Sequence, residues 1–320
     1  MPRHKCDATL HGVAQLRKSV TNIAASVHQR LLNLAHERKE EFKFVLTKYA
    51  LERMLFRISQ SKHGGVFTLK GALLFELWTE KRYRPTRDAD FLASGENSLE
   101  RLCGIFKEIS GEAVVDDGLR FDPDSVRAER IKEDADYEGI RVKLEGYLEK
   151  AAISVQIDIG FGDVVTPEAT KVDFPSMLGF PRPTLLVYPK ETVVAEKFEA
   201  MVKLGMVNSR MKDFHDLRSL CQEFRFDGRS LSEAVEKTFI RRQTPIPTKV
   251  APPVFTAEFF EDDQKKAQWS AFCRKYRGYV NDSSLESVCL DIARFLMPVV
   301  QSLNDKKSFD RSWFPKGPWN

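Results

Sequence analysis

The sequence has few of the features that mark an extracellular, membrane or strongly basic protein. Its five cysteines are odd in number and form no Cys-X-X-Cys pair, which argues against a disulfide framework or a zinc ribbon. No apolar run approaches the roughly 20 residues that a membrane helix needs, and no apolar signal segment follows the first residues. With 50 Lys and Arg against 46 Asp and Glu, the net charge is only +4. We therefore expect a cytoplasmic protein with no membrane partner.

The apolar content is ordinary, and its periodicity predicts a mixed α/β protein. The 23 Phe and 42% hydrophobic residues exclude intrinsic disorder, and 320 residues suffice for two domains. Three- and four-residue spacing predicts continuous helix over 12–60, and short runs predict strands at 66–69, 88–92, 139–144 and 152–159. Further helices are predicted at 72–78, 98–109, 190–205, 212–224, 229–241, 263–277 and 283–303. The predicted organisation is N-terminal helices (1–62), an α/β domain (63–188), a helical C-terminal domain (189–303) and a tail (304–320).

Asp88 and Asp90 are the first candidate functional residues. Side chains alternate along a strand, so both carboxylates point to one face. Their repulsion raises their pKa values unless a cation lies between them, and Mg²⁺ prefers such oxygen ligands. Isolated Asp-X-Asp triplets are more often solvated strand edges, and two others, at 122–124 and 134–136, are predicted to be solvated loops.

The context of Asp88 separates it from those triplets. A predicted strand, then Lys70-Gly71, then an apolar helix precede it. A glycine at such a turn lets the backbone approach a ligand, and the N–H groups of a helix start favour phosphate. Together, these features indicate a phosphoryl or nucleotidyl transfer site.

Asp158 is the predicted third acid. In its strand the apolar residues occupy one face, so Asp158 shares the polar face with Ser154 and Gln156. If this strand lies beside that of Asp88, three carboxylates converge, enough for two metal ions. The alternative is an exposed face of an antiparallel strand.

Two helical segments contribute further candidates. Lys197 lies on an apolar helix stripe, where it either extends to the rim or points into a cleft that binds phosphate. As a rim residue, it should be removable with little loss of stability. Asp213 and Asp216 share one helix face, either as favourable N-terminal charges or as acids facing the same cleft. His215 has no companion ligand and is interpreted as structural.

The ordered motifs resemble the AbiEii/AbiGii nucleotidyltransferase toxin family over about residues 15–300. The resemblance rests on residues 49–53 with 57–59, 67–75, 84–91, 155–160, 195–198, and Arg210 with Lys212-Asp213 and Asp216-Leu217. It implies a polymerase-β-like nucleotidyltransferase core, with N-terminal helices and a mainly helical C-terminal domain. It further implies transfer from an NTP, with tRNA 3′ ends as acceptor in characterised relatives, in a bacterial toxin–antitoxin or phage-defence pair whose antitoxin is encoded alongside.

The resemblance also assigns residues by position. Asp88, Asp90 and Asp158 would bind Mg²⁺ or Mn²⁺, Lys197 would contact phosphate and Asp213 would be the acid of the last motif. The nucleotide would be bound by Lys70, Gly71, Ala72, Thr86, Arg87 and Lys197.

One departure from the superfamily pattern affects the phosphate cradle. Ala72 follows Gly71 where the broad pattern has Gly or Ser, and fifteen residues then precede Asp88. Because Ala72 has no hydroxyl, a phosphate contact there must come from backbone N–H. Thr86 supplies a hydroxyl close to the expected terminal phosphate, which makes it a candidate for self-modification.

Two alternatives to RNA modification remain at this level. In the first, the same enzyme transfers the nucleotide to a protein side chain. In the second, the chain is a non-catalytic protein that binds nucleic acid or a partner. A cluster of basic and aromatic residues is either an RNA-facing surface or an ordinary solvated helix face: Arg241, Arg242, Lys265, Lys266, Arg274, Lys275 and Arg277, with Trp269, Tyr276 and Tyr279. We expect a monomer.

Overall fold

The N-terminal region consists of two helices rather than one. The computed structural model describes residues 22–79, 81–134, 137–248, 250–280 and 283–320 of the chain. Helix α1 (Ile23–Arg38) ends where Lys39 adopts a left-handed conformation with φ of 54°, and α2 (Phe42–Gln60) follows. The prediction of continuous helix over 12–60 is therefore wrong at 39–41, because a left-handed residue ends a helix. Residues 12–21 of that prediction lie outside the described residues.

A seven-stranded mixed sheet forms the centre of the α/β region, in the order β3-β4-β5-β2-β1-β7-β6. The central strand β2 pairs in parallel with β5 and antiparallel with β1. Four predicted strands are confirmed as β1, β2, β4 and β5, whereas β3, β6 and β7 were not predicted. The bounds are β1 Phe67–Lys70, β2 Asp88–Ala93, β3 Leu119–Asp134, β4 Tyr137–Leu148, β5 Ala151–Phe161, β6 Thr170–Asp173 and β7 Thr184–Val187.

The long strand β3 corrects the interpretation of the Asp-X-Asp triplet at 122–124 as a loop. Residues 122–124 lie in β3 at a register shift between Asp122 and Arg127, which is where a turn-like proline fits a strand. Asp124 is exposed there, as a solvated residue should be. Asp134 ends β3, and residues 135–136 lie outside the described residues.

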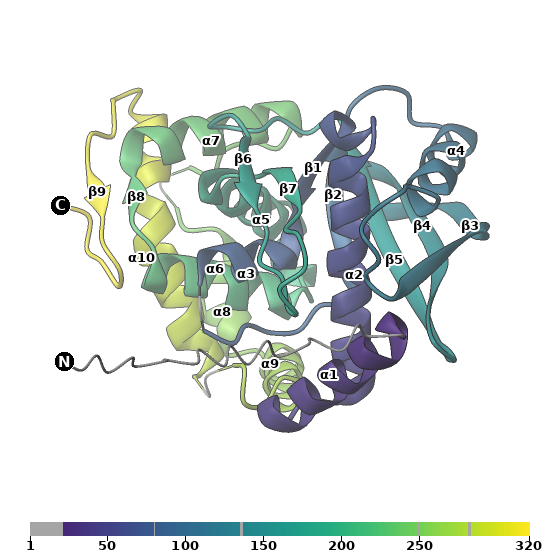
Figure 1. The fold of residues 1–320 in the computed structure, drawn as a ribbon. Helices are drawn as coiled ribbons and strands as arrows, with labels where there is room; N and C mark the ends of the chain where they lie inside the picture. Colours follow the sequence, from purple (N-terminus) through teal and green to yellow (C-terminus); the bar gives the residue numbers. More distant parts are fainter. Residues whose placement is uncertain (1–21, 80, 135–136, 249, 281–282) are drawn as a thin grey trace, which may run out of the picture.

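Helices α2 and α4 (Leu99–Ser110) pack on one face of the sheet (Figure 1). Alternate residues of β2, namely Ala89, Phe91 and Ala93, are buried toward this side, and the Phe67 ring contacts those of Phe91 and Phe106. The intervening residues of β2 face the opposite side. The two-residue period of the strand therefore separates an apolar, helix-covered face from a polar face that carries the acids.

Helices dominate the chain after β7, as predicted, and gather beside the sheet (Figure 1). The segment 304–320, expected to be a tail, packs against them: Trp313 and Trp319 are buried, and the Trp319 indole donates to the Phe295 carbonyl. Within the described ranges, no helix is long and apolar enough to cross a bilayer.

The remaining elements have the following bounds: α3 Phe75–Trp78, α5 Lys190–Leu204, α6 Met211–Glu223, α7 Gly228–Arg241, α8 Ala257–Phe260, α9 Asp263–Lys275, α10 Leu285–Asn304, β8 Phe226–Asp227 and β9 Ser312–Trp313. Short 3₁₀ turns lie at Gly64–Val66, Gly71–Leu74, Gly205–Val207 and Pro253–Phe255.

Candidate active site

The turn after β1 brings the backbone against an acid of the neighbouring strand. Gly71 begins a 3₁₀ turn with φ of +76°, a conformation that favours glycine. Lys70 pairs in register with Asp90, and a Cβ built on Gly71 would overlap the Asp90 carboxylate. Gly71 is thus required twice, for its backbone angle and for the close approach of Asp90.

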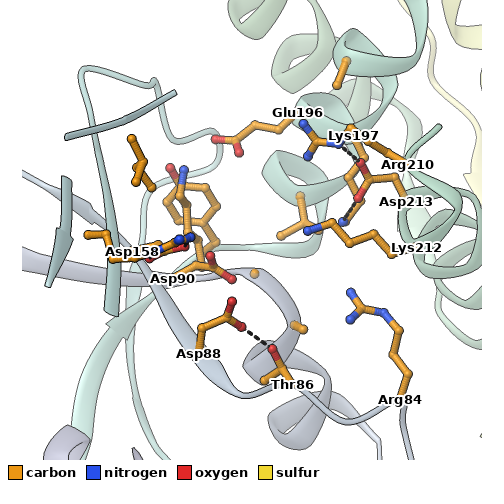
Figure 2. A pocket seen from close by; sticks show the side chains of 18 of the residues that line it. Arg84, Thr86, Asp88, Asp90, Asp158, Glu196, Lys197, Arg210, Lys212 and Asp213 are labelled. Atoms are coloured by element: carbon orange, nitrogen blue, oxygen red, sulfur yellow. Dashed lines mark hydrogen bonds and ion pairs between the residues drawn. The ribbon is translucent and has the colours of Figure 1, made fainter. Parts of the chain in front are cut away.

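The three predicted acids lie in one cavity of about 640 Å³ (Figure 2). Asp88 and Asp90 lie on the same face of β2, and Asp158 is the register partner of Asp90 on the parallel strand β5. The Thr86 hydroxyl donates a hydrogen bond of 2.5 Å to Asp88. The prediction that Asp158 shares a face with the Asp88 pair is therefore confirmed.

The charge of the acids is only partly compensated. Burial, reinforced by repulsion from Asp88, raises the pKa of Asp90 to about 7. Asp158 instead accepts two hydrogen bonds, of 2.8 and 2.7 Å, from the Arg141 guanidinium of β4. Asp88 and Asp90 thus fit a hard divalent cation, which would relieve their repulsion. Arg141 already neutralises Asp158, and the described residues include no group of three His, Cys, Asp or Glu residues that could hold a metal ion.

Lys197 and Asp213 lie on the opposite, helical wall of this cavity (Figure 2). The Lys197 ammonium is 2.6 Å from Asp213 and 2.9 Å from Asp216, and Arg210 is 2.6 Å from Asp213. Burial alone would lower the pKa of Lys197, but the two carboxylates raise it. Lys197 is therefore held at the cavity by buried ion pairs, and it is not a rim lysine.

Asp216 links this wall to the loop before β2. Its carboxylate accepts hydrogen bonds from the Tyr83 hydroxyl at 2.6 Å and from Arg84 at 2.8 and 2.7 Å. Burial would raise the pKa of Asp216, but Arg84 and Lys197 lower it well below its ordinary value. Asp213 and Asp216 are thus both ion-paired acids, but only Asp213 lines the cavity, and Asp216 is buried behind it.

Lys70 belongs to a second set of charges at the end of the cavity. Its ammonium is 3.6 Å from Asp163, which also pairs with Arg242 at 3.1 Å. Arg242 contacts Glu196 at 3.4 Å and Glu199 at 2.9 Å. Burial raises the pKa of Glu196, which lines the cavity. These contacts join the end of β5 to α5 and α7.

Alternation along the chain decides which residues in and before β2 line the cavity. Arg84, Thr86, Asp88 and Asp90 all line the cavity, whereas Arg87 is exposed and does not. Successive residues of an extended segment point to opposite sides, so Arg87 cannot share a side with Asp88. Arg84 was missed, although this two-residue spacing could have found it.

The charged lining residues Arg141, Glu196, Arg210, Lys212 and Arg242 were also not predicted as site residues. Arg141 reaches Asp158 through strand register, which no sequence pattern fixes. Lys212 is exposed and lines the cavity, and its positive charge partly offsets the rise in the pKa of Asp90. In the described part of the chain it has no ion pair within 4.0 Å.

The cluster of basic and aromatic residues forms neither a continuous RNA-facing surface nor a fully solvated helix face. The Arg242 side chain is mostly buried in the ion pairs above, and Trp269 is buried. Lys265 is buried and donates to the Asn208 carbonyl at 2.9 Å. His215 is structural, as predicted: its ring packs against Tyr83, and burial lowers its pKa to about 4.

An acid pair on a strand, a glycine turn and a facing cationic wall are typical of enzymes that transfer phosphoryl or nucleotidyl groups. The chain matches the family described as "Nucleotidyl transferase AbiEii toxin, Type IV TA system" over residues 53–296, and it belongs to that family. It is therefore a nucleotidyltransferase of a toxin–antitoxin system, with an NTP as substrate and an antitoxin as partner. The resemblance seen in the motifs is confirmed, and with it the mixed α/β nucleotidyltransferase core.

Two solved structures from Helicobacter pylori are also similar. One, described as a candidate nucleotidyltransferase, is 14% identical and covers 88% of this chain and 96% of its own, with a TM-score of 0.43. The other, JHP933, is 15% identical and covers 90% of this chain and 96% of its own, also with a TM-score of 0.43. None of the curated proteins compared with the chain matches it significantly.

Proposed function

We propose that the protein transfers nucleotides from an NTP to RNA, in particular to the 3′ end of a tRNA, with Mg²⁺ or Mn²⁺ as the cofactor. The single observation that carries the proposal is the pairing of Asp88 and Asp90 on one face of β2, opposite the cationic wall of Lys197, Arg210 and Lys212. A triphosphate between the two would meet acids on one side and cations on the other.

Each wall has a separate task in this proposal. A divalent ion on Asp88 and Asp90 would supply charge neutralisation at the reacting phosphate. Ala72 has no hydroxyl, so phosphate oxygens at this turn would be bound by the backbone N–H groups of Gly71 and Ala72. Lys197, Arg210 and Lys212 stabilise the negative charge that develops on the leaving pyrophosphate, because fixed cations need no reorganisation during the reaction. Asp158 is held by Arg141 and lies on the side of the site that is nearest to β4.

The biological consequence follows from the acceptor. Blocking the 3′ end of a tRNA prevents aminoacylation, so translation stops. We propose that this occurs in the cytoplasm, where NTPs and tRNAs are present, and that the antitoxin is encoded beside the toxin.

The test is to incubate the protein with each labelled NTP in turn and total RNA, with Mg²⁺, Mn²⁺ or EDTA. The proposal predicts label in the tRNA band with one or a few NTPs, at the 3′ end, and none in EDTA. Label on protein instead, found by mass spectrometry on Thr86 or on another protein, would replace RNA by a protein acceptor. A boiled sample and an Asp88→Asn sample serve as controls.

A further inference from the structure

A second cavity of about 660 Å³ adjoins the active-site cavity and shares three lining residues with it: Ala72, Arg84 and Thr86. Its walls come from the end of α1, the first half of α2, α3, and residues 79 and 81–86, with one residue each from the segments after β6 and α9. Thr86 donates its hydroxyl to Asp88, so the boundary between the two cavities lies directly beside an acid of the site.

The described lining of this second cavity is mainly basic. It includes Arg38, Lys48, Lys81, Arg82 and Arg84 against Glu40 and Glu76. Three of these cations already have partners: Arg84 binds Asp216, Lys48 lies 3.0 Å from Glu76, and Lys81 lies 3.3 Å from Glu223.

Arg38 and Arg82 differ from these three. Among the residues that the structure describes, neither has an ion pair within 4.0 Å, and Arg82 is exposed. These two guanidinium groups are therefore available to an anion. Guanidinium groups match phosphate oxygens in geometry as well as in charge.

Aromatic side chains line the same cavity: Phe44, Trp78, Tyr83 and Tyr279. The Tyr83 ring is used internally, because it stacks on Phe75 at 3.7 Å between centroids. Phe44 and Tyr279 have no such ring partner among the described residues, and the Tyr279 hydroxyl bonds to Glu40 at 3.4 Å. Inorganic phosphate and pyrophosphate have no ring that could stack on aromatic side chains, whereas unpaired bases do stack on them.

We propose that this cavity, called the acceptor groove below, holds the unpaired end of the acceptor RNA. Arg38 and Arg82 contact its phosphates, and Phe44 and Tyr279 contact its bases. The strand then reaches the acids past Thr86. This inference rests on the proposed function, because it assigns a place to the RNA that the proposed reaction modifies.

The test measures binding of a short, labelled single-stranded RNA, without NTP, to Arg38→Glu and Arg82→Glu. Each change should weaken binding about tenfold and should reduce the slope of log Kd against log salt by about 0.7, the value for one lost phosphate contact on a single strand. Lys307→Glu is the matched control, since it makes the same charge change at an exposed lysine outside this groove. Tyr279→Ala should weaken RNA binding without changing the salt slope.

Binding of a fluorescent NTP and of pyrophosphate, with Mg²⁺, should be unchanged in all four variants. Loss of pyrophosphate binding with normal RNA binding would assign the groove to the released product and overturn the proposal. RNA affinity equal to that of Lys307→Glu would also overturn it. If the wild-type protein neither binds nor modifies RNA, the proposed function fails; if it modifies RNA and the groove variants keep the wild-type KM for RNA, only the acceptor groove fails.

Discussion

The Arg84 guanidinium donates hydrogen bonds of 2.8 and 2.7 Å to the two carboxylate oxygens of Asp216, 132 residues further along the chain. Both side chains are buried, and Lys197 contacts the same carboxylate. Because Arg84 lies four residues before Asp88, this pair joins the segment that leads into the acid strand to the helix that carries Asp213. The distance between the two walls of the active site thus depends on Asp216.

Asp216→Asn should destabilise the protein and lower nucleotide transfer. The amide keeps the shape of the side chain but leaves Arg84 buried without its counter-charge, a change that costs about 3–5 kcal/mol when one partner of a buried pair is removed. Denaturant unfolding measures this cost. Glu223→Gln is the control on the same helix, because its pair with Lys81 is more exposed and should be worth about 1 kcal/mol or less. Equal losses in the two variants would show that Asp216 has no special role.

Lys197→Ala should affect both stability and activity, contrary to the expectation for a rim lysine. Removing the ammonium takes one of two counter-charges from Asp213, which keeps Arg210, and one from Asp216, which keeps Arg84, at a cost of about 3 kcal/mol. Transfer should fall roughly 100-fold, as for the loss of one positioned electrostatic contact. The assay is run at a temperature where the variant is folded by circular dichroism. Lys203→Ala, at an exposed position on the same helix, should cost about 1 kcal/mol or less and leave transfer unchanged. Wild-type transfer by folded Lys197→Ala would reject the phosphate role.

Gly71→Ala should disturb the site through Asp90. The left-handed backbone costs an L-residue roughly 1–2 kcal/mol, and the added methyl group displaces the Asp90 carboxylate. We expect that loss in thermal or denaturant unfolding, together with a large loss of transfer. Gly65→Ala is the matched control, because a Cβ there meets nothing within 4 Å. Normal activity in Gly71→Ala would show that the close approach of Gly71 to Asp90 is not needed.

The pKa of Asp90 predicts a pH-dependent stability in the absence of metal. An acid whose pKa is raised by folding binds its proton more tightly in the folded state, so its contribution to stability falls as the pH rises from its unfolded value, about 4, to its folded value, about 7. In EDTA, the wild type should therefore lose stability relative to Asp90→Asn across this range, and the difference should level off above pH 7. Adding Mg²⁺ at pH 8 should stabilise the wild type but not the variant. A difference that does not change with pH would contradict the raised pKa of Asp90.

Local periodicity predicted the parts of the site that lie on single elements. Asp88 and Asp90 share a face because strands repeat every two residues, and the same rule would have included Arg84 and excluded Arg87. The long helices α5, α6, α7, α9 and α10 were predicted to within two residues at both ends, because long amphipathic segments carry a strong signal. The four-residue helix α8 was not predicted, because so short a segment shows no period.

Contacts between distant elements could not be predicted in this way. The pair of Arg141 with Asp158 depends on the register of β4 against β5, and the contacts of Arg84 and Lys197 with Asp216 depend on how the helices pack beside the sheet. The strand β3 was missed because its proline and charged residues resemble a loop. Lys265 and Trp269 were placed on a surface because composition does not show which side of a helix is covered.

The most direct test of the central claim compares transfer of labelled nucleotide by the wild type, Asp88→Asn and Asp90→Asn. Asp124→Asn is the matched control, because Asp124 belongs to another Asp-X-Asp triplet and is exposed on β3. With Mg²⁺, the account predicts wild-type transfer by Asp124→Asn and less than about one-hundredth of it by the other two variants. All three variants should remain folded. Wild-type turnover by Asp88→Asn or Asp90→Asn would contradict the assignment of the active site.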